Sequence, residues 1–419
     1  MKKIKNFLKK ILPPQLILFY HCASSFLAGV YYGFPSKKII LVGVTGTNGK
    51  TTTATLLYHL FKKLGYKAGL ISTVRNRIDE EEVPAIRTTP DGLALNSLLS
   101  RMVRKGCRFC FMEVSSHAVA QHRIKGIKFA GGIFTNITHD HLDYHKTFEE
   151  YFKVKQRFFN CLGSASFALV NSDDPNARQM VEKSRARKFY YALEKEADFC
   201  SRIIRNQLSG LVLTIDGEEI ETKFVGGFNA YNLLAVYGTA VLLGEDKTRI
   251  REALKGLEPV EGRFQYFKSR TGIVGIVDYA HTPDALAKVL KTIRDIRKTG
   301  ERVITVVGCG GDRDAAKRPL MAKIACEFSD AVILTSDNPR REDPLAIIKE
   351  MEKGVGLAYA AKTRSIVNRK EAIETACGLA KPGHIILLAG KGHENYQEIN
   401  GARFHFDDRE ELKRCLESL

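Results

Sequence analysis

A segment rich in glycine and threonine, VGVTGTNGKTTT, runs from Val42 to Thr53. Glycines let a loop wrap a phosphate group with its backbone N–H groups pointing inward, Lys50 can neutralise the outer phosphates, and the Thr51 hydroxyl can ligate Mg²⁺. The strict Walker pattern requires glycine where this chain has Val44, so the generic pattern is missed by one residue. The segment still predicts an ATP-binding loop, and its assigned residues are Gly46, Thr47, Asn48, Gly49, Lys50, Thr51 and Thr52.

Two later segments carry groups that could ligate a metal ion. Glu113 ends the apolar run CFME, which predicts a strand beside the loop, so its carboxylate could hold Mg²⁺; a solvated glutamate at a strand end is the alternative. In the run HDHLDYH, His139 and His141 flank Asp140. This run nearly matches the HxHxDH signature of zinc hydrolases, but Tyr144 stands where the last histidine would be. The phosphate loop upstream therefore favours a nucleotide enzyme.

The elements that must position these residues alternate between short β-branched runs and longer helical stretches. IILVGV precedes a helix predicted from about Lys50 to Leu64, and CFMEV, GGIFTNI and FALVN read as further buried strands. From about Gly262 the alternation recurs in GIVGIVDYA, VITVVGCGG, AVILTSDNP and HIILLAGKG. Such alternation predicts an α/β fold with parallel sheets covered on both faces, and ligands bind outside the carboxyl ends of the strands.

Length and composition agree with a globular protein of two or three domains. The chain has 419 residues, of which 44% are hydrophobic and 27% charged, which excludes a disordered or fibrous chain. Its net charge of 65 − 47 = +18 favours anionic partners, although no basic stripe interleaved with aromatic residues indicates nucleic acid. The nine cysteines are odd in number and scattered, which indicates reduced thiols and a cytoplasmic location.

The first 36 residues differ from the rest of the chain. Five lysines lie among the first ten residues, and the stretch from Gln15 to Phe34 has no Asp, Glu, Lys or Arg. A signal peptide or membrane span is disfavoured because polar residues and glycines dilute the apolar stretch and no small-residue cleavage site is clear. We interpret the segment as a helix packed on the next domain; the alternative is a basic helix that contacts anionic lipid or another protein.

The motif GTNGKT, followed by MEVSSH and DHLDYH, resembles the Mur ligase family, and the resemblance covers about residue 37 to the end. It implies a monomeric ligase that uses ATP to add meso-diaminopimelate to UDP-N-acetylmuramoyl-L-Ala-D-Glu through an acyl phosphate, in peptidoglycan precursor synthesis. The expected fold is a P-loop central domain with a mostly parallel sheet, followed by a Rossmann-like α/β C-terminal domain. The expected divisions are a basic and apolar segment at 1–36, the central ATP-binding domain at 37–260 and the C-terminal domain at 261–419.

The resemblance also implies two Mg²⁺ ions and a modified lysine. His141 would ligate the second ion together with Glu113, with Asp140 as a supporting partner. Lys155, in EEYFKVKQRFF, matches the family lysine that CO₂ carbamylates, which turns a cation into an anionic ligand. The residues alone favour a solvated helix lysine, and Lys153 is the nearby competitor. The implied metal ligands are Thr51, Glu113, His141 and Lys155 as its carbamate, and the implied catalytic residues are Lys50, His141, Lys155 and Arg263.

Further nucleotide contacts are implied from two other segments. FNAYN places Asn229 and Asn232 three residues apart on a predicted helix, where a helix N-cap plus a polar surface residue is the alternative. EGRFQ and VDYAHTPDAL bring Arg263, Asp278 and His281 from the C-terminal domain to ATP, which would make domain closure a condition of catalysis.

Two groups of polar residues are assigned to the other substrates. Hydroxyl, amide and guanidinium groups suit the carboxylates and amides of a peptidyl sugar nucleotide; those assigned to the acceptor are Thr88, Thr89, Ser115, Gln121 and Arg123. A diamino diacid has a second carboxylate for an arginine and a second ammonium for Asp, Asn or Glu, and the DNPR run is typical of the diaminopimelate-adding members. The residues assigned to this amino acid are Arg313, Asp337, Asn338, Pro339, Arg340, Gly390 and Glu394.

Typical members of the family carry an N-terminal uridine-binding domain of on the order of a hundred residues. This chain has 36 residues before the strand predicted at Lys37. We therefore expect that uridine is bound weakly, that a partner supplies the contact, or that the acceptor differs. A folylpolyglutamate-type ligase and a catalytically silent nucleotide-binding homologue are the alternative functions. An active enzyme is favoured by the presence of Lys50, Thr51, Glu113, His141 and Lys155.

Overall fold

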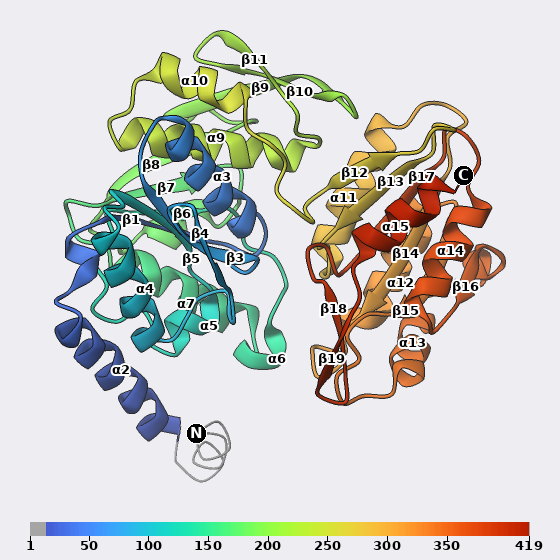
Figure 1. Cartoon of the computed structure of the whole chain (residues 1–419), viewed down its shortest axis with the longest axis horizontal. Helices are drawn as coiled ribbons and strands as arrows, with labels where there is room; N and C mark the ends of the chain where they lie inside the picture. Colours follow the sequence, from blue (N-terminus) through green and yellow to red (C-terminus); the bar gives the residue numbers. More distant parts are fainter. Residues whose placement is uncertain (1–13, 419) are drawn as a thin grey trace.

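Two sheets, each formed by its own stretch of the chain, organise the fold (Figure 1). The computed structural model describes residues 14–418. The first sheet has 11 strands in the order β11-β10-β9-β8-β7-β6-β1-β5-β2-β3-β4. Its strands are β1 (Ile40–Thr45), β2 (Ala68–Ile71), β3 (Arg75–Ile78), β4 (Glu81–Pro84), β5 (Phe109–Glu113), β6 (Gly131–Phe134), β7 (Phe167–Asn171), β8 (Arg187–Ala192), β9 (Phe199–Gln207), β10 (Gly210–Ile215) and β11 (Glu218–Thr222).

The centre of the first sheet is parallel and is buried on both faces. β1 pairs in parallel with β5 and β6, and the parallel pairing continues to β2 on one side and to β9 on the other. Val42 and Val44 join the core beneath helices α3 and α9, whereas Leu41 joins the opposite core beneath α4 and α7. The helices of this part are α2 (Pro14–Tyr31), α3 (Lys50–Lys63), α4 (Gly92–Arg104), α5 (Ser116–Ala120), α6 (Leu142–His145), α7 (Phe148–Asn160), α8 (Ala177–Val181), α9 (Gly227–Leu242), α10 (Lys247–Lys255) and the 3-10 turn η1 (Pro35–Lys37).

The second sheet has six strands in the order β12-β13-β17-β14-β15-β16, and only the edge strand β12 runs antiparallel. Helices α11 to α13 cover one face and α14 and α15 cover the other. The strands are β12 (Gln265–Lys268), β13 (Val274–Asp278), β14 (Val303–Cys309), β15 (Ala331–Ser336), β16 (Thr363–Ser365), β17 (Ile385–Ala389) and the separate hairpin β18 (Tyr396–Ile399) and β19 (Ala402–His405). The helices are α11 (Pro283–Ile296), α12 (Lys317–Phe328), α13 (Pro344–Glu352), η2 (Leu357–Lys362), α14 (Arg369–Leu379) and α15 (Asp408–Glu417).

These two sheets confirm the predicted fold class, an α/β protein with a mostly parallel central sheet and a second α/β unit. The antiparallel extensions at both ends of the first sheet, β9 to β11 and β2 to β4, had no counterpart in the sequence analysis. The chain passes from the first unit to the second between Lys255 and Gln265. The division proposed near residue 260 falls within this passage.

Helix α2 packs against α4 at the outer edge of the first unit (Figure 1). The two helices approach closely because Gly92 has no side chain: a Cβ at this position would collide with Ser25. The Ser25 hydroxyl also donates a hydrogen bond to the carbonyl oxygen of His122, at 3.2 Å. The lysine-rich stretch at residues 1–13 lies outside the described residues. No helix within residues 14–418 is both long enough and apolar enough to cross a bilayer.

Candidate active site

The loop between β1 and α3 curls around its own lysine. Gly49, at the N-cap of α3, has a φ of 85°, a left-handed conformation that glycine adopts without strain. The Nζ atom of Lys50 donates hydrogen bonds to the carbonyl oxygens of Gly46 at 2.9 Å and Thr47 at 2.7 Å. The ammonium group therefore lies over the loop at the N-terminus of α3, where a phosphate would be stabilised by the backbone N–H groups and the helix dipole.

Residues that follow β6 hold this loop in place, and the sequence analysis did not assign them. The backbone N–H groups of Thr47 and Asn48 donate to the main-chain and side-chain oxygens of Asn136, at 2.8 and 2.9 Å. The Thr135 hydroxyl donates to the carbonyl oxygen of Asn48 at 2.6 Å. Because β6 is the parallel neighbour of β1, the carboxyl ends of the two strands meet at one edge of the sheet. This rule about neighbouring parallel strands could have identified Asn136 as a loop contact from the sequence.

Lys155 lies inside the protein beside the loop. Its side chain is 1% exposed, and its Nζ donates to the carbonyl oxygen of Gly46 at 2.7 Å. Burial and the nearby charge of Lys50 lower the pKa of Lys155 well below its usual range, which favours the neutral amine. The interpretation of Lys155 as a solvated helix lysine, which the sequence alone favoured, is therefore wrong. Lys153, the competitor, is exposed and pairs with Glu149 at 2.7 Å.

The other three implied metal ligands lie around the same loop and already have protein partners. The carboxylate of Glu113 is buried and accepts hydrogen bonds from the N–H and hydroxyl groups of Thr73, at 2.7 and 3.2 Å. The Nε2 atom of His141 lies 3.4 Å from a carboxylate oxygen of Asp140. Burial lowers the pKa of His141 to about 3 against the opposing charge of Asp140, so the imidazole is neutral.

Within residues 14–418, no three His, Cys, Asp or Glu side chains gather closely enough to hold a metal ion alone. The implied set does not need such a cluster, because it combines a carboxylate, a neutral imidazole, the Thr51 hydroxyl and a lysine next to the loop. Oxygen donors of this kind suit Mg²⁺ that is shared with nucleotide phosphates. The residues present therefore fit the metal, with Lys155 as the donor that needs a carbamate to become a ligand.

Residues of the second unit reach the loop from the opposite side. Arg263 donates from Nη2 to the Thr51 hydroxyl at 3.0 Å. Asn48 donates from Nδ2 to a carboxylate oxygen of Asp284 at 2.7 Å, and the Thr138 hydroxyl donates to the same oxygen at 3.3 Å. Asp284 belongs to the segment VDYAHTPDAL but was not assigned. The two units thus already touch across the loop.

The other nucleotide residues of the second unit are buried near this contact. Asp278 accepts a hydrogen bond from the backbone N–H of Phe264 at 2.7 Å, which fixes the residue that follows Arg263. The Nδ1–H group of His281 donates a hydrogen bond to the carbonyl oxygen of Tyr279, at 2.8 Å. Burial and the charge of Lys317 lower the pKa of His281 to about 4. His281 is therefore neutral at physiological pH.

Asn232, rather than Asn229, lies against the loop. Asn232 accepts a hydrogen bond from the Thr53 hydroxyl at 3.3 Å and lies next to Gly49. Asn229 lies behind it, accepts from Asn232 Nδ2 at 3.2 Å and donates to the carbonyl oxygen of Val225 at 2.8 Å. Both asparagines are buried and Gly226 is the N-cap of α9, so the alternative of an N-cap plus a surface residue is wrong.

The five residues assigned to the acceptor form one hydrogen-bond network. The Thr89 hydroxyl lies 3.2 Å from Ser115 Oγ and 2.8 Å from the carbonyl oxygen of Glu113. Arg123 donates to the carbonyl oxygen of Thr89 at 2.9 Å and to Gln121 Oε1 at 2.6 Å. The remaining member, Thr88, accepts a hydrogen bond at 3.0 Å from the Thr73 hydroxyl, which also donates to Glu113. Glu113 therefore joins the acceptor network to the edge of the phosphate loop.

Most of the residues assigned to the amino acid gather at the carboxyl ends of β15 and β17. Asn338 donates from Nδ2 to a carboxylate oxygen of Glu394 at 2.7 Å. Gly390 has a φ of 114°, and a Cβ there would lie 3.1 Å from Oδ2 of Asp337. Asp337, Asn338 and Pro339 are buried. These residues form the floor of the site.

The two arginines of this group lie at its rim. Arg340 donates from Nη1 to the carbonyl oxygen of Gly311 at 2.7 Å, and its backbone is hydrogen-bonded to Glu398 and Asn400 of the β18–β19 hairpin. Arg313 is exposed, and a Cβ at Gly310 would lie 3.7 Å from its Cγ. A guanidinium group at this rim can donate two parallel hydrogen bonds to the two oxygens of one carboxylate.

Lys391, which was not assigned, lies at the centre of this group. It is fully buried, and its Nζ lies 3.8 Å from Asp337, 3.7 Å from Glu394 and 3.5 Å from Asn338 Oδ1. Burial and the neighbouring Asp337 raise the pKa of Glu394. The ammonium of Lys391 thus offsets the repulsion between the two carboxylates.

Two family models match this arrangement of two units. The "Mur ligase middle domain" matches residues 44–240, and the "Mur ligase, glutamate ligase domain" matches residues 262–392. The chain belongs to the Mur ligase family. The two matches flank the passage between the sheets, so the family assignment and the fold agree.

Named relatives of this Mur ligase share most of its length. A UDP-N-acetylmuramoyl-L-alanyl-D-glutamate–2,6-diaminopimelate ligase from Cytophaga hutchinsonii is 58% identical over 397 residues, which are 95% of this chain and 82% of the relative. A ligase of the same name from Bacteroides fragilis is 54% identical over 93% of this chain and 80% of its own length. A solved structure of a ligase with this name is 34% identical, has a TM-score of 0.63 and covers 93% of this chain and 81% of its own.

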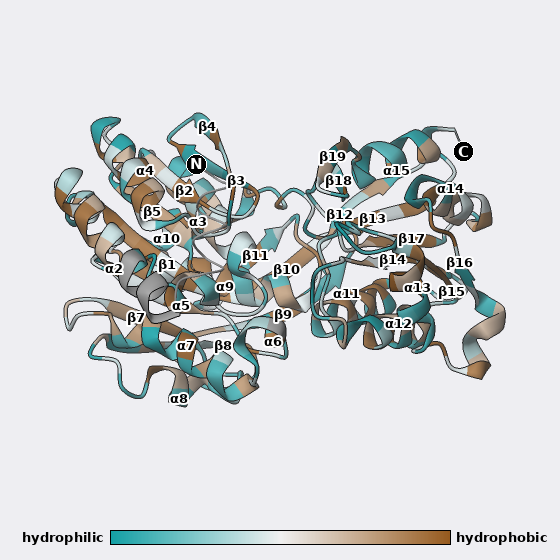
Figure 2. Cartoon of the chain, turned by 90° about the horizontal axis from the view of Figure 1, so that it is seen from below, coloured by the Kyte–Doolittle hydropathy of each residue, from teal (hydrophilic) through white to brown (hydrophobic). Residues whose placement is uncertain are grey.

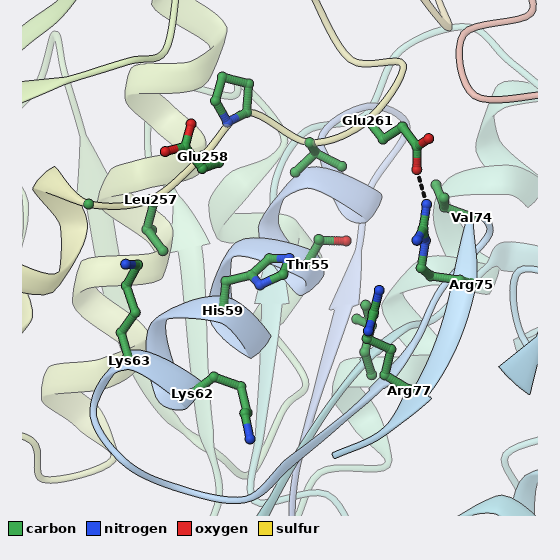
Figure 3. Close-up of a pocket in the computed structure, with 14 residues that line it drawn as sticks. Thr55, His59, Lys62, Lys63, Val74, Arg75, Arg77, Leu257, Glu258 and Glu261 are labelled. Carbon is green, nitrogen blue, oxygen red and sulfur yellow. Dashed lines mark hydrogen bonds and ion pairs between the residues drawn. The ribbon is translucent and has the colours of Figure 1, made fainter. Parts of the chain in front are cut away.

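A cavity of about 530 Å³ lies between the first unit of this Mur ligase and the linker to the second (Figure 3). Helix α3, the turn into β3 and the linker after α10 form its walls. In Figure 3, Arg75 points across the cavity to Glu261 of the linker, with which it forms an ion pair. Arg409 at the start of α15 pairs with the other carboxylate oxygen of Glu261. Glu261 therefore ties both units to the linker.

Proposed function

We propose that this Mur ligase uses ATP to add meso-diaminopimelate to UDP-N-acetylmuramoyl-L-alanyl-D-glutamate, as a cytoplasmic monomer in peptidoglycan precursor synthesis. The observation that carries the proposal is the position of Glu113, which contacts Thr73 and Thr89 of the acceptor network and lies opposite Val44, two residues before Gly46 of the phosphate loop, in the pairing of β1 with β5. An acceptor carboxylate held by that network would lie beside the terminal phosphate of ATP. The names of the relatives at 58% and 54% identity support the choice of acceptor and amino acid.

The reaction has two steps in this proposal. An oxygen of the acceptor carboxylate attacks the γ-phosphorus, the bond to the β-phosphate oxygen breaks, and an acyl phosphate and ADP form. The amine of diaminopimelate then attacks the acyl carbon, phosphate leaves, and the nitrogen loses a proton. Bound Mg²⁺ would supply charge stabilisation to the phosphates. Lys50 and Arg263 face the same place and would offset the negative charge that builds up as the two anions meet.

Water must be excluded because an acyl phosphate hydrolyses. The contacts of Asn48 with Asp284 and of Thr51 with Arg263 close the site from the side of the second unit. We propose that Lys155 carries a carbamate in the working enzyme. Its burial, its lowered pKa and its contact with Gly46 support this, because the neutral amine is the form that reacts with CO₂.

The amino-acid floor supports a diamino diacid as the second substrate. Asp337 Oδ1 is buried and has no hydrogen-bond partner among residues 14–418, so a substrate ammonium could satisfy it. Arg313 and Arg340 at the rim could pair with the distal carboxylate. A substrate with a single ammonium would leave Asp337 Oδ1 unpaired in a buried place, and one with a single carboxylate would leave Arg313 and Arg340 without that partner at the rim.

The test is an amino-acid panel with ATP and UDP-N-acetylmuramoyl-L-Ala-D-Glu, read by product mass and by phosphate release. The proposal expects release that requires both the acceptor and diaminopimelate, and little product with lysine. Product formed from a folate acceptor and glutamate would favour a folylpolyglutamate-type ligase. Absence of release with every pair would favour a silent homologue. An arm with the acceptor lacking its uridine diphosphate measures how far the nucleotide contributes to binding.

A further inference from the structure

One face of helix α2 carries large apolar side chains that no other described part of the chain covers. Phe26, Leu27, Val30 and Tyr31 are 53%, 64%, 51% and 80% exposed. Their spacing of one, four and five residues places them along one side of the helix. The opposite side packs on α4 through Ser25 and its neighbours. In Figure 2, α2 lies at the outer edge of the first unit, far from the second.

The surroundings of this apolar face are basic. Lys37 and Lys38 follow the helix, and Lys125 and Lys128 lie in the loop that meets Phe26, where a Cβ at Gly126 would lie 4.0 Å from the ring. All four lysines are exposed.

Acidic side chains are few in the neighbouring segments; Asp91, the N-cap of α4, lies 4.0 Å from Arg87. The first acidic residue of the whole sequence is Asp79, and residues 92–112, which include α4, contain none. Residues 114–139, which include the loop beside Phe26, also contain none. An apolar stripe with a rim of lysines and few carboxylates complements an anionic, partly apolar surface rather than a protein surface of mixed charge.

The sequence before α2 has the same character. Apolar residues recur at spacings of three and four, and lysines stand between them; the apolar positions are Ile4, Phe7, Leu8, Ile11 and Leu12, and the lysines are Lys2, Lys3, Lys5, Lys9 and Lys10. This spacing is typical of a basic amphipathic helix that lies in a membrane interface. The stretch lies outside the described residues, so its part in the argument rests on sequence alone.

We propose that α2 binds the enzyme to the surface of an anionic membrane. The apolar face of α2 would enter the headgroup region, and the lysines would pair with anionic lipid headgroups. No helix within residues 14–418 could cross a bilayer, so this contact lies on the membrane and does not span it. The proposal is independent of the reaction, because none of these residues belongs to the candidate active site.

Flotation of the full chain with vesicles tests the proposal. We expect the protein to float with phosphatidylcholine vesicles that contain phosphatidylglycerol, and to stay behind with pure phosphatidylcholine. Added salt should release it, because screening weakens attraction between exposed charges. Each Lys→Gln change at one of the four exposed lysines, Lys37, Lys38, Lys125 and Lys128, should lower the partition coefficient roughly fivefold, since a lysine near an anionic surface contributes about 1 kcal/mol.

A double variant, Leu27→Ser with Tyr31→Ser, should also lose flotation while keeping its melting temperature and ligase activity, because both side chains are largely exposed. The matched control is Ile86→Ser, which removes a 90% exposed apolar side chain from a different surface. Equal flotation of the double variant and the wild type would overturn the proposal. So would wild-type protein that fails to float but self-associates in sedimentation through the same two side chains, since the face would then bind protein.

Discussion

Replacement of Lys391 by methionine tests the reasoning about the amino-acid site most directly. Methionine keeps much of the volume of the side chain but removes its positive charge. Asp337 and Glu394 would then face each other with no cation between them, at a place where all three side chains are buried or nearly so. We expect both the stability of the second unit and the affinity for diaminopimelate to fall.

The size of the effect follows from the distances. At 3.7 and 3.8 Å, each ion pair is worth roughly 4 kcal/mol before desolvation is counted, with an effective dielectric constant of about 20. Removing one partner of a buried pair typically costs about 3–5 kcal/mol. For a domain of this size each 1 kcal/mol lowers the melting temperature by about 2–4 °C, so the expected fall is roughly 6–20 °C.

The effect on the reaction should appear in KM for one substrate. Lys391 contacts Asn338 and Glu394, so its loss should misplace them and weaken about one charged hydrogen bond to diaminopimelate, about 1.5–3 kcal/mol. That corresponds to roughly a 10- to 150-fold rise in KM for diaminopimelate, with KM for ATP unchanged. Kinetics with each substrate varied in turn, below the melting temperature of the variant, measure this split.

The control is Lys323→Met, which removes an exposed lysine of α12 whose ion pair with Glu327 spans 3.9 Å. Exposed pairs contribute about 0–1 kcal/mol, so this variant should match the wild type. A folded Lys391→Met enzyme with wild-type KM for diaminopimelate and a melting temperature within about 2 °C of the wild type would refute the reasoning.

Three further predictions concern other parts of the molecule. Enzyme equilibrated with ¹³C-bicarbonate should show a carbamate signal in its NMR spectrum that Lys155→Arg lacks, and CO₂ depletion should lower kcat of the wild type; the same spectrum from both proteins would contradict the carbamate. Asp284→Ala should raise KM for ATP roughly tenfold by removing its charged hydrogen bond to Asn48, with KM for diaminopimelate unchanged in the same assay. Arg369→Met should destabilise the second unit by about 3–5 kcal/mol in urea unfolding, because it leaves the fully buried Asp408 without its partner at 2.6 Å; a loss below about 1 kcal/mol would contradict this.

The sequence predicted the parallel strands and the phosphate loop because both depend on local signals. Leu41, Val42 and Val44 belong to an apolar run that begins after Lys38 and ends at the loop, and such a run in front of GTNGKT predicts a buried strand that leads into the loop. The contacts of the loop with Asn136 were within reach, because neighbouring parallel strands bring their carboxyl ends together.

Lys155 shows how a buried charge can be found from its position in a helix. It follows Tyr151 by four residues and precedes Phe158 by three, so it lies on the apolar side of α7 and not among the solvated residues. Periodicity therefore contradicts the reading of a solvated lysine, and this signal was not used.

The periodicity of the sequence could not identify Lys391 and Asp284 as site residues. Lys391 stands in a turn after β17, where no periodicity says which side chains point inward. Asp284 reaches Asn48 only because the two units lie against each other, and spacing within either unit does not specify that approach.

The linker carboxylate of Glu261 is held by one cation from each half of the enzyme, Arg75 from the first and Arg409 from the second. Any rotation of one half against the other must stretch or exchange at least one of these pairs. Ion pairs therefore hold the point about which the two units would rotate. Dissolved ions compete with Arg75 and Arg409 for the carboxylate of Glu261, which is about a third exposed. Ionic strength can consequently set how freely the two units rotate about Glu261, a residue outside those assigned to the substrates.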